Sequence, residues 1–118
     1  MDYVITNART GQLVAERAVL ASNPWTRMKG LLGRASMPAS EAIILRPAAS
    51  IHTLFMRFAL DIIYLDREDR VVKVVPNLVP YRFSAAKKAH TVLEMTSGAT
   101  AGSDLQPGDQ LLIEPARP

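Results

Sequence analysis

Residues 60–75, with the sequence LDIIYLDREDRVVKVV, decide the fold class of this chain. Two runs rich in β-branched and aromatic residues, 60–66 and 71–75, flank the charged segment 67–70. Branched and aromatic side chains pack well on a pleated surface, and a short polar segment between two such runs is typical of a hairpin tip. The stretch therefore predicts a β-hairpin with one strand on each side of residues 67–70.

The same kind of pattern recurs outward from this hairpin, because short apolar or alternating runs are separated by single Pro and Gly residues. Gly11 suits the turn between the first two runs, and Pro107-Gly108 is typical of a type II turn before the last one. Residues 76–80, bracketed by two prolines, and 81–88, which show no clear period, are expected to form surface loops. The runs that predict further strands are 3–8, 12–20, 41–46, 91–96 and 110–114.

A short amphipathic helix is predicted after the second strand. Asn23 can cap its start with Pro24 at the first helical position, and Gly33 can end it. The apolar residues that share one side at helical spacing are Trp25, Met28, Leu31 and Leu32. We expect this side to cover the sheet, and we expect a second helical turn capped by Ser97 and closed by Gly102.

These elements predict a mainly β, β-rich α+β protein. Its sheet should be compact, antiparallel and barrel-like or sandwich-like, with about seven short strands and one or two short peripheral helices, since the long crossover helices of parallel sheets are missing. The chain has 118 residues, of which 48% are apolar and 21% charged, and it contains no long Gly/Ser linker. We therefore expect a single domain over residues 1–118.

Composition also excludes several functional classes. The chain has no Cys, which rules out thiolate nucleophiles, Cys-ligated zinc and iron–sulfur clusters. No Gly-rich phosphate loop with a Lys is present, so no cofactor is predicted. The first residues lack a basic segment followed by an apolar run, and the longest apolar runs are far shorter than the roughly 20 residues of a membrane span. We expect a cytoplasmic protein without membrane insertion.

Polar side chains interrupt the otherwise apolar stretch 50–61, which makes it the candidate site. A buried imidazole at His52 needs partners for its ring nitrogens, because an unpaired buried polar group costs about 1–3 kcal/mol. Asp61 and Glu94 are the candidate partners, since each interrupts a β-rich run. A structural network of the same residues, tied to the backbone, is the alternative to a functional site.

Two functions are considered for this stretch. The first is a noncatalytic binding module whose cleft accepts a small or peptide-like ligand. The positive charge of Arg57 would favour an anionic one. The second is a hydrolase-like acid–base enzyme in which His52 is the general base, oriented by Asp61 or Glu94, with Thr53 or Ser50 near the reacting centre. No G-x-S-x-G motif or second His at a ligand spacing supports catalysis or a metal site. The predicted ligand-binding residues are His52, Thr53, Met56, Arg57, Asp61 and Glu94.

A third possibility is a surface that binds single-stranded nucleic acid. Tyr81 and Phe83 could stack on bases beside a basic rim. That rim would consist of Arg57, Arg82, Lys87, Lys88 and His90. The formal net charge is only +3 and the basic residues are spread along the chain, so a solvated face is the better interpretation and nucleic acid is not expected as a partner.

Several ordered motifs resemble those of a prokaryotic family known as domain of unknown function 192, DUF192. They are Gly30-Leu31-Leu32, the runs SIHT at 50–53 and FMRF at 55–58, Leu60-Asp61, VLE at 92–94 and LQPGD at 105–109. The similarity extends over about residues 15–113. It implies a small β-dominated domain with a peripheral helix and no established activity. It also implies that a histidine at position 52 is not required, and Ala59 stands where the family motif often has proline.

Overall fold

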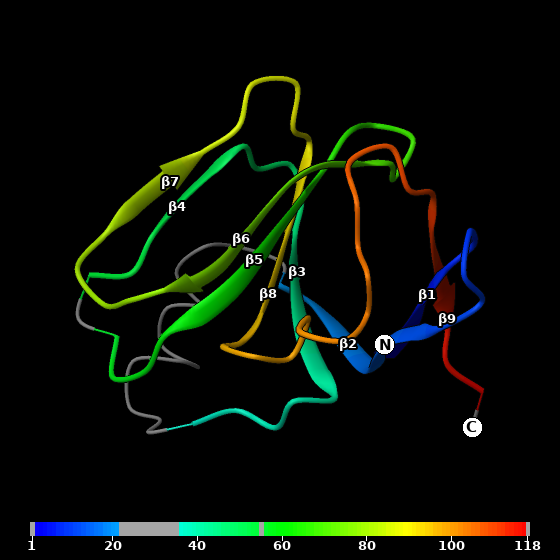
Figure 1. Ribbon diagram of the computed structural model, residues 1–118, viewed down its shortest axis with the longest axis horizontal. Helices are drawn as coiled ribbons and strands as arrows, with labels where there is room; N and C mark the ends of the chain where they lie inside the picture. Colours follow the sequence, from blue (N-terminus) through cyan, green and yellow to red (C-terminus); the bar gives the residue numbers. More distant parts are fainter. Residues whose placement is uncertain (1, 22–35, 55, 118) are drawn as a thin grey trace.

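The computed structural model describes residues 2–21, 36–54 and 56–117, which form a curled β-sheet with a small β-ribbon beside it (Figure 1). The large sheet has seven strands in the order β6-β5-β8-β3-β2-β1-β9, and the ribbon pairs β4 with β7. The strands are β1 Asp2–Asn7, β2 Leu13–Ala21, β3 Glu41–Leu45, β4 Ser50–His52, β5 Leu60–Leu65, β6 Val71–Leu78, β7 Phe83–Ala85, β8 Thr91–Thr96 and β9 Leu111–Pro115. The mainly β, barrel-like architecture predicted from the sequence is confirmed.

The two edges of the large sheet meet at one point, which gives it the shape of a half-barrel. Arg70 next to β6 forms an isolated antiparallel bridge with Gln110 next to β9. On either side of it, the N–H of Leu111 donates to the carbonyl of Asp69 at 3.0 Å and the N–H of Val71 donates to the carbonyl of Asp109 at 2.8 Å. These backbone bonds hold the start of β6 against the start of β9.

The hairpin predicted over residues 60–75 is formed by β5 and β6, which pair antiparallel with Ile63 opposite Val74. β6 continues through Pro76 to Leu78, so the loop expected over residues 76–80 was placed too early. β6 is an edge strand, and a proline is tolerated there because its missing N–H is not needed for a ladder hydrogen bond.

β2 departs from the simple alternation of inward and outward side chains. Its pairing with β1 shifts register, with Tyr3 opposite Ala18 but Ile5 opposite Ala15. This irregularity lets Ala15 and Ala18 both face the core. The expectation of an antiparallel sheet is also corrected here, because β2 and β3 are parallel and the connection over residues 22–40 is long enough for a crossover.

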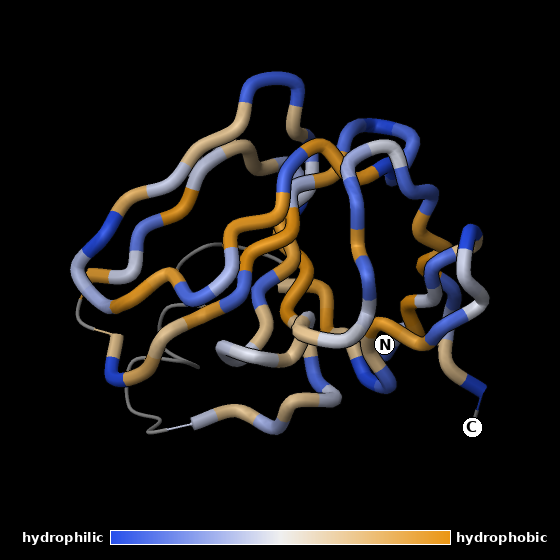
Figure 2. The backbone as a smooth tube through the Cα atoms, viewed as in Figure 1, coloured by the Kyte–Doolittle hydropathy of each residue, from blue (hydrophilic) through white to orange (hydrophobic). Residues whose placement is uncertain are grey.

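Two apolar clusters lie on opposite faces of the central strands. The inner cluster fills the curl and contains Ile5, Val14, Ala15, Ala18, Ala42, Ile44, Ile63, Leu65, Val71, Leu93, Met95 and Leu111. The outer cluster includes residues of the ribbon and contains Met37, Leu45, Ile51, Met56, Leu60, Ile62, Tyr64, Ala86 and Val92. All residues of β5 are buried, because the strand contributes to both clusters. In Figure 2 the hydropathy colouring shows that most residues along this strand are hydrophobic.

Three local predictions either differ from the structure or lie outside the residues that it describes. The helix expected between Asn23 and Gly33 lies outside the described residues. Residues 97–102 form hydrogen-bonded turns and not the expected helical turn, since Ser97 Oγ donates to Asn77 Oδ1 at 2.8 Å instead of capping a helix. Residues 83–85, expected to lie in a loop, form β7.

Within the described ranges no helix is long and apolar enough to cross a bilayer, and the cytoplasmic location stays a prediction.

Candidate functional site

Asp61 has a buried carboxylate that holds the loop after β8. The N–H of Asn77 donates to its Oδ1 at 2.9 Å. Its Oδ2 accepts from the N–H of Gly98 at 3.1 Å and from both the N–H and the hydroxyl of Thr100 at 3.0 and 2.6 Å. Burial opposes the charged form, but the hydrogen bonds from Thr100, Asn77 and Gly98 outweigh it and hold the pKa of Asp61 below its usual value.

The two predicted carboxylate partners lie on opposite faces of the sheet. Asp61 is paired with Met95, which belongs to the inner cluster, whereas Glu94 is paired with Ile62, which belongs to the outer cluster. Residues opposite each other in a ladder share a face, and neighbours along a strand do not. The prediction that His52, Asp61 and Glu94 converge is therefore wrong, because the carboxylates of Asp61 and Glu94 are separated by the sheet itself.

Thr53 is fully buried and joins the segment after β4 to the loop before β7. Its hydroxyl donates to the carbonyl of Val79 at 2.7 Å and accepts from the N–H of Arg82 at 2.9 Å. Its own N–H donates to the carbonyl of Arg82 at 2.9 Å, and its carbonyl accepts from the N–H of Tyr81 at 3.0 Å. Thr53 thus positions the two residues that precede Phe83. Met56 is buried in the outer cluster, whereas Arg57 is exposed.

His52 lies beside exposed aromatic residues. Its ring contacts that of Phe83, the residue opposite it in the ribbon, with 6.0 Å between ring centroids. Its buried Nδ1 has no hydrogen-bond partner within the described ranges. Phe83 is 74% exposed and Tyr81 58% exposed. We call His52, Arg57, Tyr81, Arg82 and Phe83 the ribbon surface.

A buried polar contact connects the ribbon to the large sheet. The hydroxyl of Tyr64 in β5 donates to Ser84 Oγ in β7 at 2.8 Å. Burial raises the pKa of Tyr64, the hydrogen bond to Ser84 opposes this, and the charge of Glu94 raises it further. Tyr64 and Glu94 therefore lie close together beneath the inner side of the ribbon, whereas Phe83 faces solvent.

The charges of the chain are strongly segregated along its sequence. Residues 42–60 and 70–93, which include both ribbon strands, contain no Asp or Glu. All 11 acidic residues lie outside these two ranges. The basic residues within them are Arg46, Arg57, Arg70, Lys73, Arg82, Lys87 and Lys88.

The basic rim proposed from the sequence is nevertheless not one continuous patch. Residues 86–90 follow β7 at one end of the ribbon, whereas residues 53–59 leave β4 at its other end (Figure 1). His90 lies near Asp69, whose pKa is raised by burial and lowered in part by the charges of Arg46 and His90. Arg57 and Arg82 therefore belong to the ribbon surface, and His90 does not.

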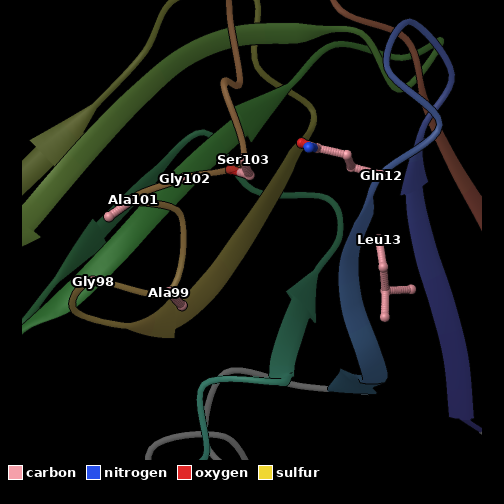
Figure 3. A pocket seen from close by; sticks show the side chains of 7 residues that line it. All are labelled: Gln12, Leu13, Gly98, Ala99, Ala101, Gly102 and Ser103. Carbon is pink, nitrogen blue, oxygen red and sulfur yellow. The ribbon is translucent and has the colours of Figure 1, made fainter.

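An open groove of about 450 Å³ lies beside the segment that links β8 to β9. We call this segment, residues 97–108, the strap. Figure 3 shows Gln12 extending its amide from the β2 side toward the strap across the groove. The groove is lined by Gln12, Leu13, Gly98, Ala99, Ala101, Gly102 and Ser103. None of the predicted site residues lines this groove.

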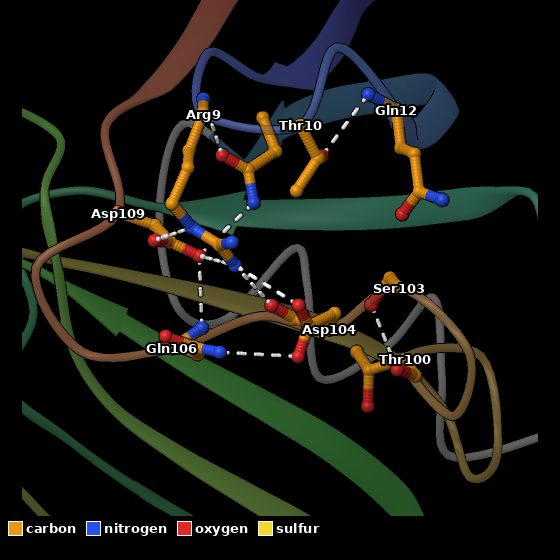
Figure 4. A network of polar contacts seen from close by, with 9 residues as sticks. Arg9, Thr10, Gln12, Thr100, Ser103, Asp104, Gln106 and Asp109 are labelled. Atoms are coloured by element: carbon orange, nitrogen blue, oxygen red, sulfur yellow. Dashed lines mark hydrogen bonds and ion pairs between the residues drawn. The ribbon is translucent and has the colours of Figure 1, made fainter.

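The far end of the strap is held by Asp109 and Arg9 (Figure 4). Asp109 accepts from Arg9 Nε at 2.6 Å, from Asn7 Nδ2 at 3.0 Å and from the N–H of Gln106 at 2.9 Å. Arg9 also donates to the carbonyl of Asp104 at 2.6 Å. One buried carboxylate, just before β9, thus ties the end of β1 to the strap.

We expect this carboxylate to make stability depend on pH in the acid range. The hydrogen bond from Arg9 is the largest cause that lowers the pKa of Asp109 from 3.8 to about 2, against the opposing effect of burial. Since the folded protein favours the charged form, the stabilisation is complete above the unfolded value and is lost as the pH falls through about 2. Urea unfolding should show that the difference in the free energy of unfolding between the wild type and Asp109→Asn becomes smaller as the pH falls from 3.8 to about 2. A difference that does not change over this pH range would contradict the assignment.

Sequence reasoning missed Tyr64, Ser84 and Asn7 as partners in polar contacts. Tyr64 and Asn7 look like ordinary residues of apolar strands, so the sequence carried no signal for them. Asp109 follows the Pro107-Gly108 turn, and a carboxylate at that place was the one available signal. Within the described part of the chain, no three His, Cys, Asp or Glu side chains gather closely enough to hold a metal ion.

Comparison with known proteins places these features in a family. A UPF0127 protein of Pyrococcus furiosus is 32% identical over 111 residues, which are 89% of this chain and 93% of that protein. A solved structure of a protein of unknown function from Novosphingobium aromaticivorans is 28% identical with a TM-score of 0.77, covering 95% of this chain and 84% of the other.

A second solved structure, of a protein from Sinorhizobium meliloti proposed to be a transcription regulator, has a TM-score of 0.79 at 19% identity. It covers 95% of this chain and 92% of the other, and at that identity it shows the fold alone. Residues 5–113 match the DUF192 family, described as "Uncharacterized ACR". The match confirms the resemblance carried by the sequence motifs, and the chain belongs to the DUF192 family.

Proposed function

We propose that this protein is a noncatalytic binding module for an acidic, peptide-like ligand that contacts the ribbon surface. The observation that carries the proposal is Phe83, an aromatic residue that is 74% exposed at the end of the ribbon where β7 begins opposite His52. Large exposed apolar groups flanked by polar residues are typical of interaction sites, and aromatic and Arg residues are enriched among those that dominate binding energy. Arg82, which directly precedes Phe83, and Arg57 are the exposed cations that we assign to the ribbon surface.

Charge supports an acidic ligand. The ranges 42–60 and 70–93 carry Lys and Arg without a single acid, so the ribbon is surrounded in sequence by one sign of charge. Complementary charge accelerates encounter and disfavours partners of like charge. In this proposal Arg57 and Arg82 select the ligand by its negative charge, and Phe83 contacts its apolar part.

The arrangement gives less support to a hydrolase-like enzyme. A general base at His52, oriented by Asp61 or Glu94, needs a carboxylate bonded to its ring, but its buried Nδ1 has no hydrogen-bond partner among the described residues. Asp61 directs its own hydrogen bonds to Asn77, Gly98 and Thr100. Thr53 was considered as a residue near a reacting centre, but its hydroxyl donates to the carbonyl of Val79 and accepts from the N–H of Arg82. We therefore assign Asp61 and Thr53 to positioning the loops around the ribbon and not to contact with the ligand.

Replacing Phe83 by alanine is expected to weaken binding of an acidic peptide at least about tenfold, the effect of losing one central aromatic contact. The probe is the labelled peptide acetyl-Glu-Val-Glu-Val-Glu-Val-Glu-amide, followed by fluorescence anisotropy. Leu112→Ala is the matched control, because Leu112 is also an exposed apolar residue, at 42%, but lies on β9. Arg82→Gln should weaken binding and reduce its dependence on salt.

Equal affinities of Phe83→Ala and Leu112→Ala would contradict the assignment of the ribbon surface. Binding of oligothymidylate, with no binding of the acidic peptide, would replace the proposal by a single-stranded nucleic-acid site, for which the affinity falls steeply with salt.

A further inference from the structure

The backbone of β7 points to the way in which the ligand is held. We infer that the acidic peptide adds to the outer edge of β7 as an extended strand, which rests on the proposed function and specifies its geometry. Strand addition takes its affinity from main-chain hydrogen bonds, and side chains at alternate positions supply specificity. Strand addition to β7 requires unused backbone donors and acceptors on that strand, access to them from solvent, and nearby charges that select the ligand.

The register of the ribbon shows which groups of β7 are unused. The N–H of Ala86 donates to the carbonyl of Ala49 at 3.0 Å, and the N–H of Thr53 donates to the carbonyl of Arg82 at 2.9 Å. In an antiparallel ladder such bonded positions alternate with positions whose N–H and C=O groups point away from the partner strand. Phe83 and Ala85 occupy the alternate positions, so their backbone groups point away from β4.

Lys73 confirms the direction of this edge. Its Nζ donates to the carbonyl of Ala85 at 3.0 Å, from outside the ribbon. By this register the N–H and C=O of Phe83 and the N–H of Ala85 point away from β4, and outside the β4–β7 ladder they have no hydrogen-bond partner among the described residues. These three groups form the start of a ladder that an added strand would complete.

The edge is accessible. Arg82, Phe83 and Ala85 are all exposed, and only Ser84 between them is half-buried, because it bonds Tyr64 on the inner side. In Figure 1 β7 forms the outer margin of the ribbon. Natural sheets commonly protect exposed edges with lysines or prolines, and residues 81–85 contain neither.

The ligand is expected to be acidic because cations follow the edge. Lys73 reaches Ala85 from one side, and a carboxylate on the residue opposite Ala85 would lie within reach of its ammonium group. Arg82 precedes Phe83, and Lys87 and Lys88 follow Ala85 closely in sequence. Side chains alternate between the two faces of a strand, so an extended peptide with an acid at every second position places all its carboxylates on one face. There they can form ion pairs with these cations.

The decisive variant is Ala85→Pro, which removes an outward N–H without removing a bond between β7 and β4. Proline is tolerated on edge strands for this reason, and Ala85→Ser is the matched control because it keeps the N–H. We expect Ala85→Pro to weaken binding of acetyl-Glu-Val-Glu-Val-Glu-Val-Glu-amide at least about tenfold and Ala85→Ser to bind like the wild type. In the wild type, saturating peptide should slow hydrogen exchange of the Phe83 and Ala85 amides.

The outcomes separate this inference from the proposed function. If Phe83→Ala weakens binding but Ala85→Pro does not, and the two amides keep their exchange rates, strand addition is overturned and the binding module stands. If the peptide binds no variant and not the wild type, the proposed function itself fails. If the protein dimerises without peptide and Ala85→Pro makes it monomeric, the occupant is a second copy and the peptide is rejected. If Ala85→Pro does not fold, the exchange measurement on the wild type decides alone.

Discussion

Replacing Asp61 by alanine is expected to lower the free energy of unfolding by about 4 kcal/mol, among the larger effects of a single substitution. The carboxylate is 1% exposed and accepts hydrogen bonds from the backbone of Asn77, Gly98 and Thr100 and from the Thr100 hydroxyl. Without it, the donors of three separate residues lose their acceptor, and each such loss in a buried place costs about 1–3 kcal/mol.

Urea unfolding measures this change, and Asp66→Ala is its control. Asp66 also accepts two backbone N–H groups, from Glu68 and Arg70 at 2.9 Å each, but in an exposed turn where water can replace it. We expect the control to lose only about 1 kcal/mol. A loss of similar size in both variants would show that Asp61 does not hold the strap in the way described.

Replacing Thr53 by valine should lower the free energy of unfolding by about 2 kcal/mol and also weaken peptide binding. Valine keeps the shape of the side chain but leaves the carbonyl of Val79 and the N–H of Arg82 without the hydroxyl that now serves both. These atoms belong to the loop that positions Tyr81 and Arg82 on the ribbon surface. Loss of its hydrogen bonds should make this loop less ordered and so weaken its contacts with the ligand.

Thr53→Ser is the matched control because it keeps the hydroxyl. Its unfolding free energy and peptide affinity should both stay near those of the wild type, apart from the loss of one buried methyl group. If the serine variant loses as much stability as the valine variant, the methyl packing and not the hydroxyl is what matters at this position, and the positioning role of Thr53 is wrong.

Local sequence patterns predicted most strands of the fold, because β-branched runs and their Gly and Pro boundaries report local geometry. They failed where tertiary contacts decide. Phe83–Ala85 has no alternation of its own and becomes a strand because Ser50–His52 pairs with it. The parallel contact of β2 with β3 and the register shift beside Ala15 depend on distant segments, and no short window contains that information.

The candidate site was predicted less well than the fold. Thr53, Asp61 and Glu94, selected because they interrupt apolar runs, are buried, whereas His52, whose imidazole was expected to be buried, is only half-buried. Interruption of a run also does not reveal which face of a sheet a side chain occupies. A shift of one position along a strand reverses the face, so Asp61 and Glu94 came to lie on opposite sides of the sheet. The binding role of the predicted residues stays a prediction.

The position of β9 has a consequence for the growing chain. β1 lies between β2 and β9, and β9 is composed of residues 111–115. Before residues 111–115 have been synthesised, β1 lacks its neighbour on one side, and such an unpaired strand edge is prone to pair with other chains. The large sheet can therefore be completed only once these residues have emerged from the ribosome, and the nascent chain is most vulnerable to aggregation until then.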